Sequence, residues 1–447
     1  MENKIHKFGE KVLYLYLFFL FVVMPLYSKG GYHMISTTKW ALFCNVSYGY
    51  QFGYFFIPGF LIILSFCFIF EVLFYKAYVE KFDKADIMLL LFGVVVALSE
   101  KISFYHLTYF VTEESQAFVG YRGWYMGLIA QISFILIYFF VKRYWGGSKR
   151  IVDIAIIGST IVFFLAVLNR FDIDLLGFTG SLLEVDKHDY VSTIGNINWY
   201  VCYLAVLFPL SVYSYIGASN RIKKILYGIA IMIGTATLVT QGSDSAFLVL
   251  GVLVLYLLKN EDNNVLIELL LIVSGTCILI GFLQNLFSSY AYVPNRLSEL
   301  VTKSFVLYVL FGLGLLFRNK IDLFDKFKKL VFKMIPILLL LVIVYILLNT
   351  FNILPEQLRT YGYFRISDSW GNNRGNIWRV GVYAFIAFVI DHPYVLFLGA
   401  GPDQYANMIF TYNYEEVVVQ RSTVFVSCAH NEFLNTLCNY GILGFVS

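Results

Sequence analysis

The sequence predicts an all-α fold, a polytopic transmembrane helix bundle of about 12 spans with one large extracytoplasmic loop before the last span. Hydrophobic residues make up 59% of the 447 residues and charged residues only 14%, whereas a soluble globular chain carries about 25% charged residues. The apolar residues fall into separate runs of helix length, and lysine and arginine collect in alternate connections between these runs. The net charge of +4 follows from basic cytoplasmic loops and requires no nucleic-acid partner.

Twelve apolar runs are candidate spans, although several are shorter than the roughly 20 residues that cross a bilayer upright. The first run follows a short basic N-terminus, and no small-x-small cleavage site comes after it, so we expect a span and not a signal peptide. The runs lie at 12–27, 54–75, 87–98, 124–141, 151–168, 196–216, 225–239, 246–258, 265–282, 304–317, 334–350 and 431–447.

The lysines and arginines indicate the orientation of these spans. With the N-terminus in the cytoplasm, 20 of the 33 Lys and Arg residues fall on the cytoplasmic side and 13 on the outer side. This is the positive-inside distribution of membrane proteins. It predicts a bundle of about 11 spans over 1–350, an extracytoplasmic loop over 351–429, and a final span over 430–447.

The loop 351–429 is too long for a simple connection. No lysine follows Lys333, yet the loop carries arginines at 359, 365, 374, 379 and 421. The planar guanidinium group binds phosphate through two parallel hydrogen bonds and stays charged at any working pH. We therefore expect pyrophosphate binding by Arg374, Arg379 and Arg365, the alternative being that these are retained surface arginines.

Within this loop, the strongly apolar segment 376–390 is too short for a comfortable span. It fits a re-entrant or interfacial helix, which would hold Arg374 and Arg379 at the level of lipid headgroups. A thirteenth span would instead place His430 in the cytoplasm, but only Arg421 supplies positive charge between 391 and 429, so the charge distribution disfavours it. Gly399-Ala400-Gly401 is more typical of a turn than of an anion-binding loop.

His430 and Asn431 stand where this outer loop enters the last apolar run. Neither ATP nor a nucleotide sugar is available on the outer face, so a donor there must arrive already activated, as a lipid pyrophosphate. His430 would accept the proton of an acceptor hydroxyl, since its ordinary pKa of about 6.5 suits a general base. Asn431 would orient the ring or bind a sugar hydroxyl. The alternative is that both residues cap the helix.

The same residues carry a family resemblance. His430-Asn431, Leu434, Gly441 and Gly444 resemble the His-Asn-x-x-Leu…Gly-x-x-Gly signature of the O-antigen ligase/polymerase family of bacterial polytopic membrane glycosyltransferases. The segments 373–378 and 391–405 resemble its Arg…Trp…His-Pro…Gly-x-Gly stretch, and 192–198 resembles its Ser-Thr-x-Gly-Asn-x-Asn entry to a middle span. The three motifs occur in the family order.

The resemblance implies a metal-independent glycosyltransferase of the bacterial cytoplasmic (inner or plasma) membrane, working without a cofactor. Its partners would be an undecaprenyl-pyrophosphate-linked glycan, a glycan or lipid acceptor, and membrane lipid. Polymerase and ligase activities stay open, with a slight preference for a polymerase because the composition suggests an AT-rich genome. By motif, His430 matches the essential histidine, Arg374 the loop arginine, and Asn196 and Asn198 residues of a substrate-binding segment.

The chain departs from the family pattern at two places and stops early. The segment 241–245 reads Gln-Gly-Ser-Asp-Ser where relatives often have a Ser-Arg pair, so a phosphate-binding arginine is missing or replaced from elsewhere. Asn439 stands where an acidic residue is often found. Relatives usually continue for another helix beyond the position of Ser447, so we expect the final span to belong to a longer protein.

Two other functions are disfavoured by the sequence. A polysaccharide flippase or secondary transporter needs ionisable groups near the middle of the bilayer, whereas Glu71, Asp153 and Glu268 are expected to reach water at cytoplasmic helix ends. A metal-dependent glycosyltransferase led by an acid in the first outer loop is disfavoured because 28–53 contains no Asp or Glu. Other possible bases, at 403, 415, 416 and 432, are expected to be solvated surface acids.

Overall fold

The computed structural model describes residues 2–52, 54–75, 82–107, 117–183, 186–360, 362–413 and 426–447. Over these ranges the chain is helical apart from two antiparallel hairpins of two strands each, which confirms the all-α prediction. The chain divides into two compact units. Unit 1 comprises Met1–Leu13, Ser47–Trp145 and Ile335–Ser447, and unit 2 comprises Tyr14–Val46 and Gly146–Met334. Three helices continue from one unit into the other, namely α1 (Glu2–Phe18), α3 (Ile35–Tyr48) and α14 (Ile321–Thr350).

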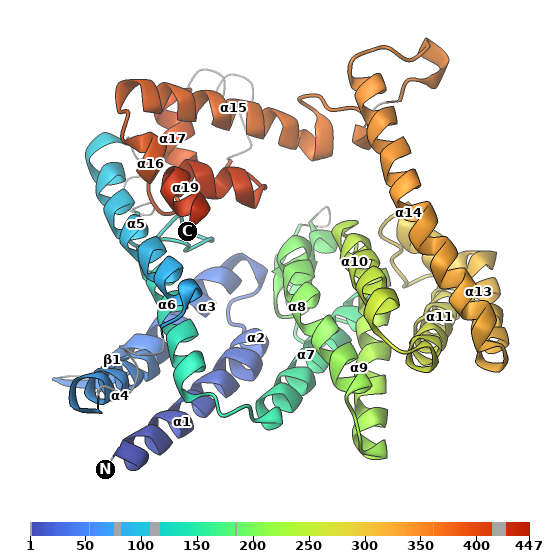
Figure 1. Ribbon diagram of the computed structural model, residues 1–447, viewed down its shortest axis with the longest axis horizontal. Helices are drawn as coiled ribbons and strands as arrows, with labels where there is room; N and C mark the ends of the chain where they lie inside the picture. The colour runs from blue at the N-terminus through green and yellow to red at the C-terminus, as the bar shows by residue number, and fades with distance from the viewer. Residues whose placement is uncertain are drawn as a thin grey trace. The chain divides into compact units, whose positions relative to one another are not determined.

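Unit 1 joins the early helices of the chain to its last ones. Its elements are the hairpin of β1 (Gly49–Phe52) and β2 (Phe55–Pro58), α4 (Phe60–Tyr75), α5 (Lys84–His106), α6 (Leu128–Tyr144), η6 (Glu356–Leu358), η7 (Gly362–Phe364), α15 (Trp370–Asp391), α16 (Val395–Leu398), α17 (Tyr405–Tyr412) and α19 (Glu432–Val446). The helices α15, α16, α17 and α19 lie together with α5 beside them (Figure 1). Their buried side chains form one apolar core that includes Phe388, Tyr405 and Cys438.

Unit 2 is a bundle of long apolar helices. Its elements are η1 (Phe19–Val23), α2 (Met24–Leu26), η2 (Tyr32–Met34), α7 (Lys149–Asn169), η4 (Thr179–Ser181), η5 (Lys187–Asp189), β3 (Tyr190–Val191), β4 (Gly195–Asn196), α8 (Ile197–Ile216), α9 (Arg221–Thr240), α10 (Ser245–Asn260), α11 (Asn263–Leu286), α12 (Arg296–Lys303) and α13 (Phe305–Asn319). The helices α7, α8, α9 and α11 pack around one core, which contains Phe163, Phe208 and Ile231.

Six helical segments among the described residues are long and apolar enough to cross a membrane, at Lys4–Leu26, α7, α8, α9, α11 and α14. The pair α12 and α13 passes the same criterion together but is bent by 47°. Several such helices in one chain mark a multi-pass membrane protein. The count of 12 spans stays a prediction, although each of the twelve predicted runs overlaps a helix.

Two predicted runs begin with non-helical structure. In the run 54–75, Phe55–Pro58 forms strand β2, and α4 starts only at Phe60. Pro58 ends the strand and Gly59 separates it from α4. In the run 124–141, residues 124–127 belong to a loop, and α6 starts at Leu128. Neither correction removes the helix from its run.

The three acidic residues that were predicted to lie at cytoplasmic helix ends, Glu71, Asp153 and Glu268, are paired with basic side chains. Asp153 contacts Lys223 and Glu268 contacts Lys224, each at 2.7 Å, with all four side chains partly exposed. Glu71 is only 1% exposed, so the prediction that it reaches water is wrong. A buried carboxylate requires a counter-charge, and Arg143 supplies it at 2.6 Å within unit 1.

Candidate functional site

His430 occupies a sharp corner at the entrance to α19. Its φ is +48°, a left-handed conformation that costs a residue with a Cβ roughly 1–2 kcal/mol. The preceding residue is held from two helices: the Ala429 carbonyl accepts a hydrogen bond from Trp378 Nε1 of α15 at 2.9 Å, and the Ala429 N–H donates to Asn435 Oδ1 of α19 at 3.4 Å. These contacts maintain a backbone strain of the kind that collects at functional sites.

Asn431 is the N-cap of α19. Its Oδ1 accepts a hydrogen bond from the Leu434 N–H at 3.2 Å, and its carbonyl accepts the first helical bond from the Asn435 N–H at 2.8 Å. The capping alternative is therefore confirmed for Asn431, because its side-chain oxygen satisfies an N–H that the helix leaves unpaired. A direct catalytic role for Asn431 stays a prediction.

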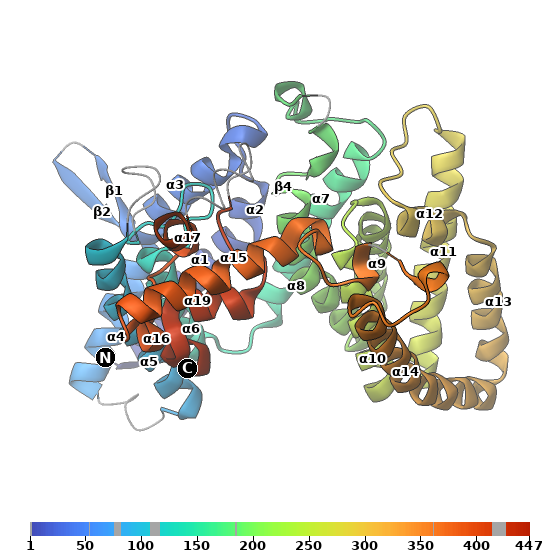
Figure 2. The ribbon, with the colours of Figure 1, turned by 90° about the horizontal axis from the view of Figure 1, so that it is seen from above.

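Arg374 reaches the site from α15, which runs beside α19 (Figure 2). It lies one helical turn before Trp378, so both residues share the face of α15 that meets the His430 corner. Gly371 and Asn373 have φ values of +59° and +67°, so the first turn of α15 is irregular and begins earlier than the predicted 376–390 helix. Arg374 is half-buried, and within the described residues its guanidinium makes no hydrogen bond or ion pair.

The His430 ring is kept neutral by its surroundings. Partial desolvation lowers the pKa of His430 below its ordinary value of 6.5, and the positive charge of Arg374 lowers it further. His430 Nδ1 lies 3.7 Å from the sulfur of Cys428, a buried thiol, and the imidazole and the indole of Trp124 meet edge to face. An unprotonated imidazole at neutral pH can accept a proton.

The other arginines of the loop have partners within the protein. Arg379 donates to both carboxylate oxygens of Asp368, at 3.0 and 3.1 Å, and Arg365 donates to Asn352 Oδ1 at 3.1 Å. Arg359 donates to two backbone carbonyls, and Arg421 lies outside the described residues. Of the three arginines predicted to bind pyrophosphate, the structure brings Arg374 to His430 and holds Arg379 and Arg365 on other groups.

The Gly-x-Gly segment at 399–401 is a turn that packs against the middle of α19. Gly399 and Gly401 have φ values of +71° and +114°, and the Gly401 N–H donates to the Asn439 carbonyl at 2.9 Å. α19 is kinked at Gly441, where φ is +64° and a Cβ would overlap the Phe397 backbone. The turn prediction is confirmed, and the glycines of two motifs are explained by close backbone approach.

Asp403 is buried, so its interpretation as a solvated surface acid is wrong. Its side chain is 8% exposed, and Oδ2 accepts hydrogen bonds from the N–H groups of Tyr121 at 2.7 Å and Met126 at 3.2 Å. Burial raises the pKa of Asp403 to about 7, although the two N–H donors oppose this shift. Glu432 is exposed as predicted, and the acids at 415 and 416 lie outside the described residues.

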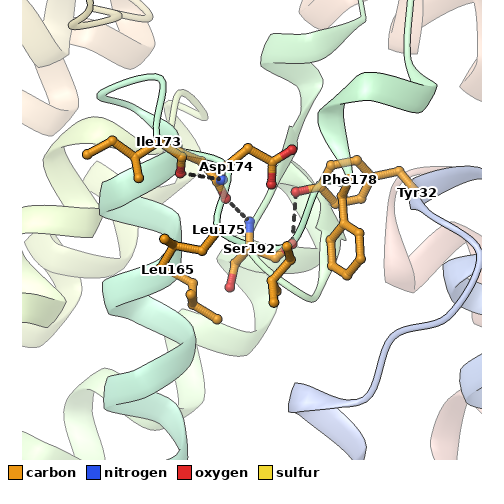
Figure 3. Close-up of a pocket in the computed structure, with 9 residues that line it drawn as sticks. Tyr32, Leu165, Ile173, Asp174, Leu175, Phe178 and Ser192 are labelled. Atoms are coloured by element: carbon orange, nitrogen blue, oxygen red, sulfur yellow. Dashed lines mark hydrogen bonds between the residues drawn. The ribbon is translucent and has the colours of Figure 1, made fainter.

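Asn196 and Asn198 lie in unit 2, whereas His430 lies in unit 1. Asn196 caps α8 by accepting a hydrogen bond from the Asn198 N–H at 2.9 Å, and Asn198 Oδ1 accepts one from Ser243 Oγ at 3.4 Å. Ser192, which precedes Asn196 by four residues, borders a small pocket (Figure 3). Its carbonyl accepts a hydrogen bond from the Tyr32 hydroxyl, and its N–H donates one to Asn169 Oδ1. The motif 192–198 therefore organises one end of unit 2.

Arg170 lies at the segment 241–245, where relatives often have an arginine of their own. Its Nη2 donates to the carbonyls of Gln241 and His188, and its guanidinium lies 5.3 Å from the ring centre of Tyr292. The side chain is 2% exposed. Arg170 therefore fastens segments of unit 2 together. The expectation that a phosphate-binding arginine is missing or replaced from elsewhere stays a prediction.

Three residues around His430 were not among the predicted site residues, although Trp378 belongs to the motif segment 373–378. Trp124 and Cys428 contact its ring, and Trp378 holds the Ala429 carbonyl. The spacing of four between Arg374 and Trp378 was an available signal for Trp378. Within the part of the chain that the structure describes, no group of three His, Cys, Asp or Glu side chains is arranged to bind a metal ion.

Comparison with known proteins gives one match. The sequence model of the family described as O-antigen ligase matches residues 295–447, which contain Arg374, Trp378, Asp403 and His430. No curated protein and no solved structure shows significant similarity to the chain.

Proposed function

We propose that the chain, whose residues 295–447 match the O-antigen ligase family, transfers a glycan from undecaprenyl pyrophosphate to an acceptor hydroxyl on the outer face of the bacterial cytoplasmic membrane. The family match supports glycosyl transfer of the O-antigen ligase type, with a lipid-linked glycan as donor and a polysaccharide acceptor. The observation that carries the proposal is the strained backbone of His430, which α15 and α19 hold in place. The half-buried Arg374 lowers the pKa of its imidazole.

His430 acts as the general base. A proton on Nδ1 would point toward Cys428, which lies 3.7 Å away, and Nε2 is then left to accept a proton. As the acceptor hydroxyl attacks the anomeric carbon of the donor sugar, its proton moves to Nε2 and a new glycosidic bond forms. The bond between the anomeric carbon and the pyrophosphate oxygen breaks, so that undecaprenyl pyrophosphate leaves with the bonding electrons.

Arg374 binds the pyrophosphate and stabilises the negative charge that grows on it as the bond breaks. It suits this task because, among the described residues, it has no carboxylate or carbonyl partner to displace. Arg379 and Arg365 could bind the same anion only after releasing Asp368 and Asn352. Asn431 contributes by fixing the backbone next to His430. By their motif, Asn196 and Asn198 are proposed to bind glycan.

Several finer points belong to the same proposal. The N-terminus lies in the cytoplasm, and the loop 351–429 lies outside and provides Arg374. As the family resemblance implies, the reaction needs neither metal nor cofactor. Polymerase activity is preferred slightly over ligase activity on the composition of the chain. These points rest on the charge distribution and on the motif residues.

The test is His430→Ala in the host, followed by analysis of surface polysaccharide and lipid-linked sugars. Loss of long chains, with single repeats still attached at the surface, identifies a polymerase. Loss of all attached glycan, with polymer left on the lipid carrier, identifies a ligase. Unchanged glycans at a normal protein level would remove His430 from the mechanism and overturn the proposal.

A further inference from the structure

The segment Ala117–Gly127, here called the Trp124 loop, is a compact loop that leads into α6. Its two ends are joined by backbone hydrogen bonds, from Leu128 N–H to the Ala117 carbonyl at 2.9 Å and from Gly127 N–H to the Val119 carbonyl at 3.3 Å. Within it, the Trp124 N–H donates to the Tyr121 carbonyl at 3.0 Å. The loop therefore has a defined shape of its own in unit 1, the unit that contains His430.

Asp403 fills the inside of this loop. Its Oδ2 accepts the N–H groups of Tyr121 and Met126, on either side of Trp124. A Cβ on Gly120, which has a φ of +96°, would lie 2.7 Å from the same oxygen, so the loop closes tightly around the carboxylate. The next residue, Gln404, donates its N–H to Asn439 Oδ1 at 3.1 Å, and this contact ties the segment to α19.

This attachment places Trp124 against the catalytic base. The indole and the imidazole of His430 have ring centroids 6.4 Å apart, and their planes are inclined by 68°. The half-buried Trp124 therefore lies beside the imidazole and stays partly exposed.

We propose that Trp124 is a stacking surface for a sugar ring of the transferred or accepting glycan, and that Asp403 is a positioning residue that holds this surface beside His430. The inference rests on the proposed function. A pyranose ring has faces made of C–H groups and an edge that carries its hydroxyls. A ring lying flat on an indole buries the C–H face against an aromatic surface, and its hydroxyl edge stays available to a base at the side.

Binding of the purified undecaprenyl-pyrophosphate-linked repeat unit of the host tests Trp124 directly. The protein carries His430→Ala, so that binding is measured without turnover. Trp124→Ala should weaken binding roughly tenfold, the loss expected for one aromatic contact, and Trp124→Phe should weaken it less. Trp145→Ala is the matched control, because Trp145 is an exposed indole at the opposite end of the 17-residue helix α6. Equal binding by the Trp124→Ala and Trp145→Ala proteins would overturn the proposal.

Hydrogen exchange tests the positioning role of Asp403. Asp403→Ala should speed exchange of the Tyr121 and Met126 amides and weaken glycan binding about as much as Trp124→Ala. Asp403→Asn keeps an oxygen acceptor and should restore both. Faster exchange with unchanged glycan binding would refute the link between Asp403 and Trp124. These readouts do not depend on turnover, so a loss of binding in Trp124→Ala would stand even if His430→Ala left glycan transfer intact in the host.

Discussion

Substitutions of Asn431 can separate its capping role from a direct role in the reaction. The structure assigns its Oδ1 to the Leu434 N–H at 3.2 Å, and this contact stabilises the first turn of α19. Asn431→Ala leaves that N–H without its side-chain acceptor, and loss of an N-cap costs about 1 kcal/mol. Asn431→Ser keeps a capping oxygen and should cost only a few tenths of a kcal/mol, but it removes the amide group that would bind a sugar hydroxyl.

A cost of about 1 kcal/mol corresponds to a factor of about five in the opening equilibrium of the first turn. The amides at the start of α19 should therefore exchange about fivefold faster in Asn431→Ala and at nearly the wild-type rate in Asn431→Ser. Glycan transfer should follow the same order, falling by no more than about tenfold in Asn431→Ala, because the imidazole and Arg374 are untouched.

The two readouts together decide the role of Asn431. Loss of a donor that acts on the transition state lowers the rate by about 10²–10³. Transfer by Asn431→Ser that falls this far, with wild-type hydrogen exchange, would show that the amide acts in the reaction itself and would refute the capping account. Unchanged exchange in Asn431→Ala would show that the cap contributes nothing.

Three further outcomes are expected. Arg374→Ala removes a positive charge, so it should raise the pKa of His430 and move the acidic limb of the pH–rate profile to higher pH. Arg374→Lys keeps the charge and should leave the limb in place. An unmoved limb in both variants would contradict the effect of Arg374 on the pKa of His430. The pKa of Asp403 is raised to about 7 in the fold, so the stability of the wild-type protein should fall by on the order of 4 kcal/mol as pH rises from about 4 to 7. Asp403→Asn should flatten this fall in a series of thermal-unfolding measurements. Equal slopes in the two proteins would contradict the raised pKa. A Cβ on Gly441 would overlap the Phe397 backbone, so Gly441→Ala should clearly lower the unfolding temperature. Gly362→Ala should lower it less, because Gly362 has a φ of +81° but open space around it. Equal effects would contradict the close-packing explanation.

Much of the fold follows from the composition, because runs of apolar residues in a membrane protein form helices whatever their partners. The lengths of these helices are predicted less accurately by the composition. The hairpin of β1 and β2 stands at the start of a predicted span, and it was signalled by Gly53 and by the Pro58-Gly59 pair rather than by hydropathy. The bend between α12 and α13 falls at Ser304, where the predicted run 304–317 begins, but hydropathy did not predict the polar helix α12 before it.

The site was predictable where its residues stand in a local motif, as with His430, Asn431 and Arg374. Trp124 lies 306 positions before His430, and no periodicity links residues at that separation. Asp403 was misassigned because acidic side chains are rarely buried. Its burial depends on two backbone N–H groups of the Trp124 loop, which only the folded chain brings to it.

The most direct test of the central claim is transfer by the purified protein in proteoliposomes, with undecaprenyl-pyrophosphate-linked repeat unit as donor and acceptor glycan supplied from the host. The account predicts a new glycosidic bond and release of undecaprenyl pyrophosphate by the wild-type protein, and loss of both in His430→Ala at equal folding. Movement of the lipid-linked glycan across the bilayer without any new glycosidic bond would contradict it.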